Sequence, residues 1–183
     1  MTRLIFKGVV LAAVLLSLSS TGCRHHYIPD LDRIPTEEFP PYQSSNSVSL
    51  LNGHPPITEE SILFTRVTRV YGNLFDMTEA AIQVGTRELR RREMVISPDS
   101  SRSLTLSINE VEFGGTSSTV HTNVSMHVES GSGSSQVFVG KNWSVLVGSL
   151  DRQIDGAIMR AVVAMLSDPE IISYLTSESH PND

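Results

Sequence analysis

The stretch VHTNVSMHV, residues 120–128, decides the fold. Val124, Met126 and Val128 alternate with polar residues. Because successive side chains of a strand point to opposite faces, this pattern gives one packed face and one face in water. Such a strand is typical of an antiparallel sheet that covers a core with one side only. The face in water would carry His121, Asn123, Ser125, His127 and Glu129.

A second strand is expected to return alongside the first. Residues 131–134, Gly-Ser-Gly-Ser, have the composition of a hairpin loop. Beyond them the large apolar residues share one parity, and we expect this set to face the core: Val137, Val139, Trp143, Val145 and Val147. Lys141 falls in the same series and would need a bulge at Gly140, or an edge position, to reach water.

A third strand precedes the first one. Residues 104–108 alternate between apolar and polar, and the apolar parity then slips by one position. That slip predicts a bulge near Asn109 and Glu110. Further upstream, residues 62–70 are rich in β-branched side chains and predict one additional strand.

Two helices flank the three strands. Residues 74–94 carry apolar residues at spacings of three and four, and Asn73 is placed to cap this helix. The same spacing recurs over residues 150–165, with Ser149 as the expected cap. Asp168 followed by proline then predicts the start of one more helical turn.

The order of these elements defines the fold class. It is strand, helix, three antiparallel strands, helix, which predicts an α+β domain over residues 61–176. A sheet with one apolar face needs a cover, so we expect the helices to pack on one face of the sheet. Residues 177–183 form a polar tail.

The first 22 residues have the composition of an export signal. Arg3 and Lys7 give a basic head, residues 8–18 form a short apolar core, and residues 19–22 are all small. This core is too short to cross a bilayer, which takes about 20 apolar residues. The pattern predicts a secretory signal peptide over residues 1–22 that is removed from the mature protein.

The single cysteine follows this signal directly. Cys23 has no partner for an internal disulfide, and an exposed free thiol would be an oxidation liability in an exported protein. Residues 20–23, Ser-Thr-Gly-Cys, resemble the lipobox of bacterial lipoproteins. The resemblance implies a lipid attachment at Cys23 and anchoring to a membrane through acyl chains such as palmitate. Arg24 in the next position, rather than an aspartate, resembles the sorting signal for the outer membrane, with the domain facing the periplasm.

The charge of the mature chain disfavours two kinds of partner. Residues 1–22 hold two of the 14 basic residues and none of the 20 acidic ones, so the mature chain carries a formal charge of −8. This charge disfavours binding to nucleic acid and broad binding to anionic lipid surfaces. We therefore expect no nucleic-acid partner, and we expect the covalent lipid to do the anchoring.

Residues 23–60 are expected to form the lipidated N-terminus and a tether. Six of the nine prolines fall between residues 29 and 56, and no strand or helix period persists. We interpret the segment as an extended linker from membrane to domain. Its apolar residues either dock on the domain or form a peptide that a partner recognises: Tyr27, Ile28, Leu31, Ile34, Phe39 and Tyr42.

Residues that could support catalysis or metal binding form no recognisable motif. Glu110 and Glu112 lie two apart on an expected strand, which suits either a carboxylate pair or a solvated face. The six histidines lack companions at ligand spacing. Four arginines at the end of the first helix suit a phosphate or lipid-headgroup patch, or else a solvated helix end: Arg87, Arg90, Arg91 and Arg92. We expect no enzyme, no cofactor and no metal.

The C-terminal third resembles a known family. Residues 150–154, LDRQI, lead into an amphipathic helix, and residues 165–175, MLSDPEIISYL, follow at its end. This arrangement resembles the YajG-type family of uncharacterised bacterial lipoproteins, over residues 61–175. The resemblance implies a lipobox and the order of strand, helix, three strands and terminal helix. It carries over no catalytic residues.

These patterns predict a lipid-anchored protein of the bacterial envelope. We expect a non-enzymatic interaction or assembly subunit at the outer membrane, with an envelope protein as partner and the exposed sheet edge as one route of binding. The alternative is a binding module for a lipid or glycan of the envelope. A deep apolar cavity between sheet and helices would favour the alternative, and a filled core would count against it.

Overall fold

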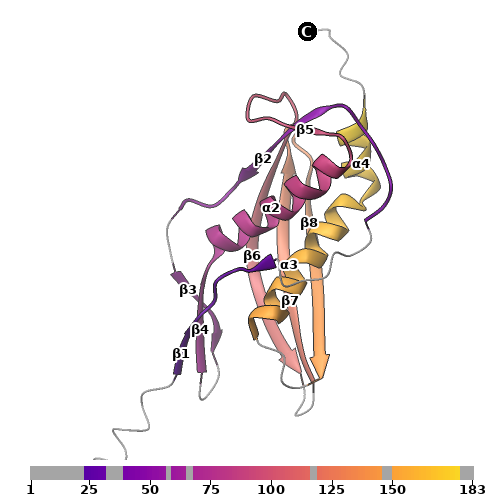
Figure 1. Cartoon of the computed structure of the whole chain (residues 1–183). Helices are drawn as coiled ribbons and strands as arrows, with labels where there is room; N and C mark the ends of the chain where they lie inside the picture. The colour runs from indigo at the N-terminus through magenta and orange to yellow at the C-terminus, as the bar shows by residue number, and fades with distance from the viewer. Residues whose placement is uncertain are drawn as a thin grey trace, which may run out of the picture.

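A computed structural model describes residues 23–31, 39–56, 59–64, 68–115, 119–145 and 150–177. The predictions made for residues 1–22, Ile34, Val147, Ser149 and most of the polar tail lie outside these residues. The described part of the chain forms an α+β fold with three helices and two sheets (Figure 1).

The larger sheet has five strands and is mixed. Its antiparallel half consists of three long strands: β6 (Ser103–Gly115), β7 (Thr119–Ser130) and β8 (Ser135–Val145). Two short strands, β2 (Ser47–Asn52) and β5 (Val95–Ile96), extend it to the order β5-β2-β6-β7-β8, and β2 runs parallel to both of its neighbours. The α+β class and the three antiparallel strands are confirmed. The element order is not matched in full, because β2 and β5 have no counterpart among the predicted strands.

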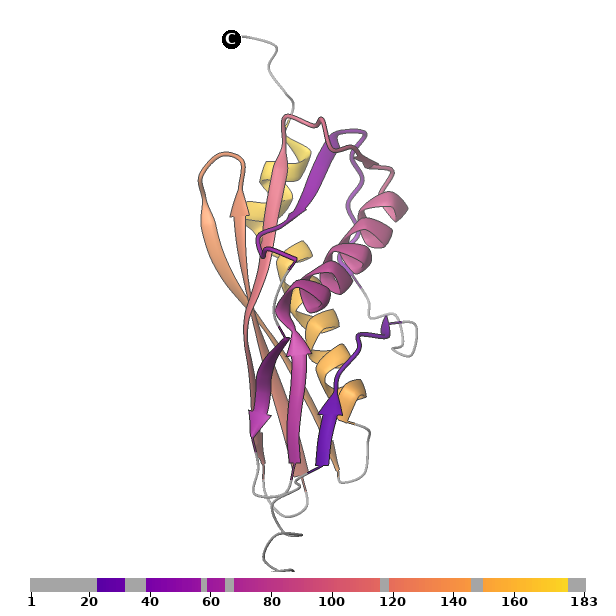
Figure 2. The ribbon, with the colours of Figure 1, turned by 90° about the vertical axis from the view of Figure 1, so that its left-hand side faces the viewer.

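One face of this sheet is apolar and buried. Six side chains of β6 and β7 form it: Leu104, Leu106, Ile108, Val124, Met126 and Val128. Helix α2 (Leu74–Arg91) packs over β6 and β2, and helix α3 (Leu150–Leu166) packs over β7 and β8. Figure 2 shows both helices on the same side of the sheet, as predicted. The register of β6 against β7 shifts between Ile108 and Glu110, which confirms the predicted bulge.

The smaller sheet has the order β1-β4-β3. Strand β1 (Cys23–His26) is parallel to β4 (Thr68–Asn73), and β3 (Glu59–Phe64) is antiparallel to β4. The prediction of one strand over residues 62–70 is therefore wrong. The stretch covers parts of two antiparallel strands, in which Leu63 pairs with Val70.

The prediction that the segment up to residue 60 is an extended tether without regular structure is also wrong. Strands β1 and β2 belong to the two sheets, and the backbone N–H of Tyr27 donates to the Tyr71 carbonyl at 2.8 Å. The prolines of the described part lie outside the strands, so they remove no hydrogen bond from a ladder. Docking on the domain holds for Tyr27, Leu31, Phe39 and Tyr42, whereas Ile28 is exposed.

The prediction for β8 is wrong in its parity. Val137, Val139 and Trp143 are 60%, 43% and 67% exposed, while Phe138 faces the core. The reason lies at Gly140, where an added Cβ would come within 1.8 Å of the carbonyl oxygen of Ala157 on α3. The face that carries the glycine therefore meets the helix, because a residue without a side chain admits this close approach. Lys141 reaches water on the outer face, and the β7–β8 register runs without a bulge.

Local hydrogen bonds fix both ends of α2. The Asn73 side chain accepts from the N–H of Phe75 at 2.9 Å, which confirms the predicted cap. At the other end Glu93 adopts a left-handed φ of 66°, and the N–H of Met94 donates to the Leu89 carbonyl at 3.1 Å. This closing motif ends the helix at Arg91, three residues before the predicted end.

The last helix, α4 (Pro169–Thr176), begins as predicted. Oδ1 of Asp168 accepts from the N–H groups of Glu170 and Ile171 at 2.9 and 3.1 Å. Ile171 and Leu175 are buried, so this short helix packs back onto the domain.

Candidate functional site

The predicted lipid attachment residue opens strand β1. Cys23 pairs with Thr68 of β4 in parallel register. Figures 1 and 2 both place the start of β1 at the end of the molecule opposite to α4. Sheet pairing therefore begins at Cys23 itself, with no unpaired stretch between this residue and the first strand.

A buried pair of polar side chains lies four residues further on. The Tyr27 hydroxyl donates to Oδ1 of Asp155 at 2.5 Å, and the backbone N–H of Asp30 donates to the same oxygen at 3.3 Å. Both Tyr27 and Asp155 are buried. The pair joins the beginning of the folded chain to helix α3. Sequence reasoning missed it, and the one available signal was an acidic residue within the apolar stripe of α3.

Burial changes the acidity of both groups. Desolvation raises the pKa of Asp155 to about 6, although the hydrogen bonds from Tyr27 and Asp30 act in the opposite direction and the charges of Asp151 and Asp30 act in the same direction. Desolvation and the charge of Asp155 raise the pKa of Tyr27 far above its usual value, so the phenol stays protonated and donates. Oδ2 of Asp155 has no hydrogen-bond partner among the described residues. The fold thus holds a buried carboxyl that titrates near neutral pH.

A second polar cluster fixes the N-terminal segment to the end of α2. Arg92 is buried, and its Nη1 and Nη2 donate to the carbonyls of Glu88 and Pro40 at 2.7 and 3.1 Å. The guanidinium also lies over the rings of Phe39 and Tyr42, 5.2 and 4.8 Å from their centroids, which is a favourable placement for a cation. Arg92 is therefore an interior residue, and it is not part of the predicted surface patch of four arginines.

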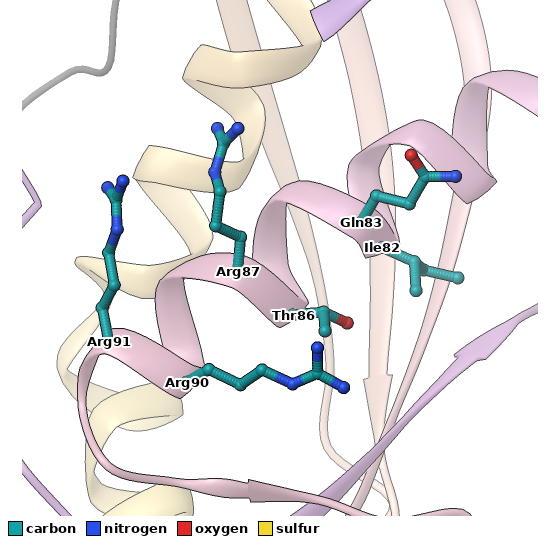
Figure 3. A pocket seen from close by; sticks show the side chains of 6 residues that line it. All are labelled: Ile82, Gln83, Thr86, Arg87, Arg90 and Arg91. Carbon is teal, nitrogen blue, oxygen red and sulfur yellow. The ribbon is translucent and has the colours of Figure 1, made fainter. Parts of the chain in front are cut away.

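The other three arginines of that patch border a hollow on the side of α2 that faces away from the sheet (Figure 3). The hollow measures about 530 Å³, its surface is mostly carbon, and it is lined by Ile82, Gln83, Thr86, Arg87, Arg90 and Arg91. In Figure 3, Arg87 and Arg91 project the same way from successive turns, while Arg90 extends on the side of Thr86. The structure brings three of the predicted arginines to one site.

A buried carboxylate holds two of these arginines in place. Glu88 is almost fully buried, and its Oε1 accepts from Nη1 of Arg91 at 2.8 Å and lies 3.5 Å from Nε of Arg87. Arg90 is exposed and has no ion pair or hydrogen bond with any described residue. Residues 87–93 contain four arginines and two glutamates, so this segment carries a net charge of +2 in a chain whose total is −6.

A second candidate surface is the outer face of β8. Val137, Val139 and Trp143 lie on it in water, at the edge of the five-stranded sheet. Exposed apolar side chains that follow one strand mark interaction sites more often than scattered ones do. The N–H of Trp143 is already occupied by the side-chain oxygen of Asn142 at 3.1 Å.

The edge of β8 is closed at one end and open at the other. Nη1 of Arg160 on α3 donates to the Lys141 carbonyl at 2.6 Å, so the backbone groups of Lys141 point to the outer edge. Because a strand repeats every two residues, the backbone groups of Val137 and Val139 point the same way. No backbone bond from another described segment reaches these two residues. The open part of the edge therefore coincides with two of the exposed apolar side chains.

The predicted carboxylate and histidine candidates remain dispersed. Glu110 and Glu112 are both exposed on β6, and Glu112 accepts a long hydrogen bond from Asn123, as on a solvated strand. Within the described ranges, no three histidine, cysteine, aspartate or glutamate side chains lie close enough to hold a metal ion. None of the helices in the described part combines the length and the apolar character needed to cross a bilayer.

Comparison with known proteins gives likenesses of fold only. No protein-family model matches the chain, and no curated protein matches it in sequence. A PelC dodecamer from Paraburkholderia phytofirmans is similar with 12% identity and a TM-score of 0.37, over 73% of this chain and 95% of that one. A Xanthomonas campestris protein of the family DUF330 is similar with 11% identity and a TM-score of 0.41, over 85% of this chain and 95% of that one. At these values neither likeness carries a functional argument, and the YajG-type resemblance stays a prediction.

Proposed function

We propose that this chain is a lipid-anchored protein of the bacterial envelope, attached through acyl chains on Cys23, that acts as a non-enzymatic interaction or assembly subunit. The observation that carries the proposal is β8, where an open stretch of backbone edge coincides with the exposed side chains of Val137 and Val139. A partner strand added to this edge would gain backbone hydrogen bonds and apolar contacts together.

The position of Cys23 supports the same proposal. Strand β8 begins near α4 and runs toward the end of the molecule where β1 starts (Figure 1). A lipid on Cys23 would hold that end at the membrane, which for the proposed outer-membrane address means its periplasmic face. Val137 and Val139, near the beginning of β8, would then lie far from the bilayer and be accessible to a periplasmic protein.

The test changes the edge and leaves the anchor intact. A Val137→Lys, Val139→Lys double variant places two charges where the partner strand would bind, and charged edges resist strand addition. We expect a stoichiometric envelope protein to co-purify with the membrane-extracted wild-type protein and to be lost from this variant. Val95→Lys is the matched control, because Val95 is equally exposed and apolar but lies on β5, at the opposite edge of the sheet.

Retention of the partner by the double variant would contradict the role of β8. Loss of the partner from Val95→Lys as well would show a general effect of added charge, and it would contradict the proposal equally.

A binding module for a small envelope ligand is the second candidate function. The space between sheet and helices is filled by fully buried side chains such as Met126, Ile158 and Met159, which counts against a ligand inside the fold. The observation that favours a ligand is the arginine-bordered hollow on the outside of α2.

A further inference from the structure

We infer that the hollow on α2 binds the phosphate group of an anionic amphiphile, such as a single glycerophospholipid molecule, with Arg90 on the phosphate and Ile82 beneath the apolar part. This goes beyond the interaction role proposed for β8. It requires neither that surface nor a lipid on Cys23.

The first support is that the site is held in shape before any ligand arrives. Glu88 is buried in the helix and bonds Arg91, with Arg87 at 3.5 Å, so two long side chains are already restrained. Ordering a flexible side chain on binding costs free energy, and restraint in the free protein removes part of that cost. The other oxygen of Glu88 lies 3.6 Å from Nη1 of the buried Arg92, so the same carboxylate ties the rim of the hollow to the interior.

The second support is unused capacity for an anion. Arg90 is exposed and has no ion pair or hydrogen bond with a described residue, so its guanidinium is available to a ligand. The guanidinium group presents paired donors that match the oxygens of a phosphate. The net charge of +2 over residues 87–93 stands out in a chain that is otherwise acidic.

The third support concerns the rest of the ligand. The hollow is mostly carbon, contributed by Ile82 and the stems of Gln83, Thr86 and the arginines, and none of the residues that line it is aromatic. A nucleotide would need an aromatic or similar flat surface for its base, and a sugar polymer would need more polar partners. Alkyl chains are what a carbon surface beside an anion site accommodates best.

The test uses the full-length protein as it is purified, in phosphatidylcholine nanodiscs when it carries an acyl anchor and in buffer when it does not, with the same medium without protein as the blank. Three probes are titrated by calorimetry: dihexanoyl-phosphatidylglycerol, dihexanoyl-phosphatidylcholine and inorganic phosphate. We expect saturable binding of the anionic lipid, about tenfold tighter than either other probe, since one charge-assisted hydrogen bond is worth about 1.5 kcal/mol or more.

Variants assign the binding to the hollow. Arg90→Gln should weaken the anionic lipid about tenfold, whereas Lys141→Gln, which removes the same charge from an exposed site on β8, should change nothing. Ile82→Ser should weaken the anionic lipid without changing the response to phosphate. Arg90 is exposed and unpaired within the described residues, so its substitution leaves the fold intact.

Three results would overturn the inference. These are no saturable binding of the anionic lipid, equal losses in Arg90→Gln and Lys141→Gln, and equal affinity for phosphate and lipid, which would identify free phosphate as the ligand. None of them bears on Cys23 or β8, so failure here is distinguishable from failure of the proposed function.

Discussion

The Tyr27 hydroxyl and the Asp155 carboxylate meet where the N-terminal segment crosses α3. The carboxylate accepts two hydrogen bonds on one oxygen and none from the described residues on the other, so its burial is only partly compensated. A buried charge that is incompletely bonded destabilises a fold. The same carboxylate binds Tyr27 and Asp30, which lie just after Cys23, to helix α3. This contact explains structurally why an acidic residue occupies a buried position on α3.

This carboxyl predicts a specific dependence of stability on pH. Its pKa is raised to about 6 from an ordinary value of 3.8, so the folded state holds the proton over a range in which the unfolded state has released it. Its contribution to the free energy of unfolding is therefore largest below about pH 4, falls as the pH rises, and is lost above about pH 6. The substitution Asp155→Asn removes the titrating group, so the variant should not show this decrease in the free energy of unfolding as the pH rises.

The measurement is urea unfolding of wild type and Asp155→Asn at pH 4.5 and pH 7. Because one unit of pKa corresponds to about 1.4 kcal/mol, we expect the variant to gain roughly 1–2 kcal/mol relative to wild type between the two values. A difference between the proteins that stays constant with pH would show that Asp155 does not titrate in this range.

Residue-level features were predictable where they are local. The caps at Asn73 and Asp168 were readable because donor and acceptor lie within three residues of each other. The Tyr27–Asp155 bond joins residues 128 apart, and no short pattern encodes it. The arginine cluster was visible as a run of charges, but only the fold separates buried Arg92 from the three that border the hollow.

At the scale of elements, the crossing of α3 over β8 explains why the apolar pattern of this strand predicts the wrong buried face. For β6 and β7 the apolar residues are also the buried ones, and alternation predicts their inner face correctly. On β8 the helix lies against Phe138 and Gly140. Because glycine has no side chain, it does not mark its face of the strand as apolar in the sequence. The larger side chains, Val137, Val139 and Trp143, therefore suggest the wrong face.

That crossing predicts a large effect from the smallest substitution. Gly140→Ala would place a methyl group 1.8 Å from the Ala157 carbonyl oxygen and 2.4 Å from the Ala161 nitrogen, both backbone atoms of a packed helix. We expect the free energy of unfolding to fall by about 3 kcal/mol, since an overpacked core must shift backbone to make room. Val139→Ala, next to it and partly exposed, should change stability by only about 0.5 kcal/mol. Equal effects of the two substitutions in urea unfolding would contradict the close crossing.

At the scale of the whole molecule, the N-terminal segment belongs to the folded domain and is not a flexible tether. The proline content predicts a linker, but both strands of this segment belong to sheets. Strand β1 pairs with β4 and strand β2 pairs with β6, and each partner lies about 50 residues later in the sequence. Pairings at this separation depend on the complete fold, and composition does not report them. The consequence is that a lipid on Cys23 would hold the domain close to the membrane in a defined orientation. The open edge of β8 and the arginine end of α2 would then lie toward the far end (Figures 1 and 2).

The acyl group on Cys23 is the claim on which this orientation depends, and intact mass spectrometry of the protein extracted from membranes tests it most directly. We predict a chain that begins at Cys23 and is heavier than its sequence by a diacylglyceryl group and an additional acyl chain. A chain that begins at any other residue, or that begins at Cys23 with an unmodified thiol, would contradict the account.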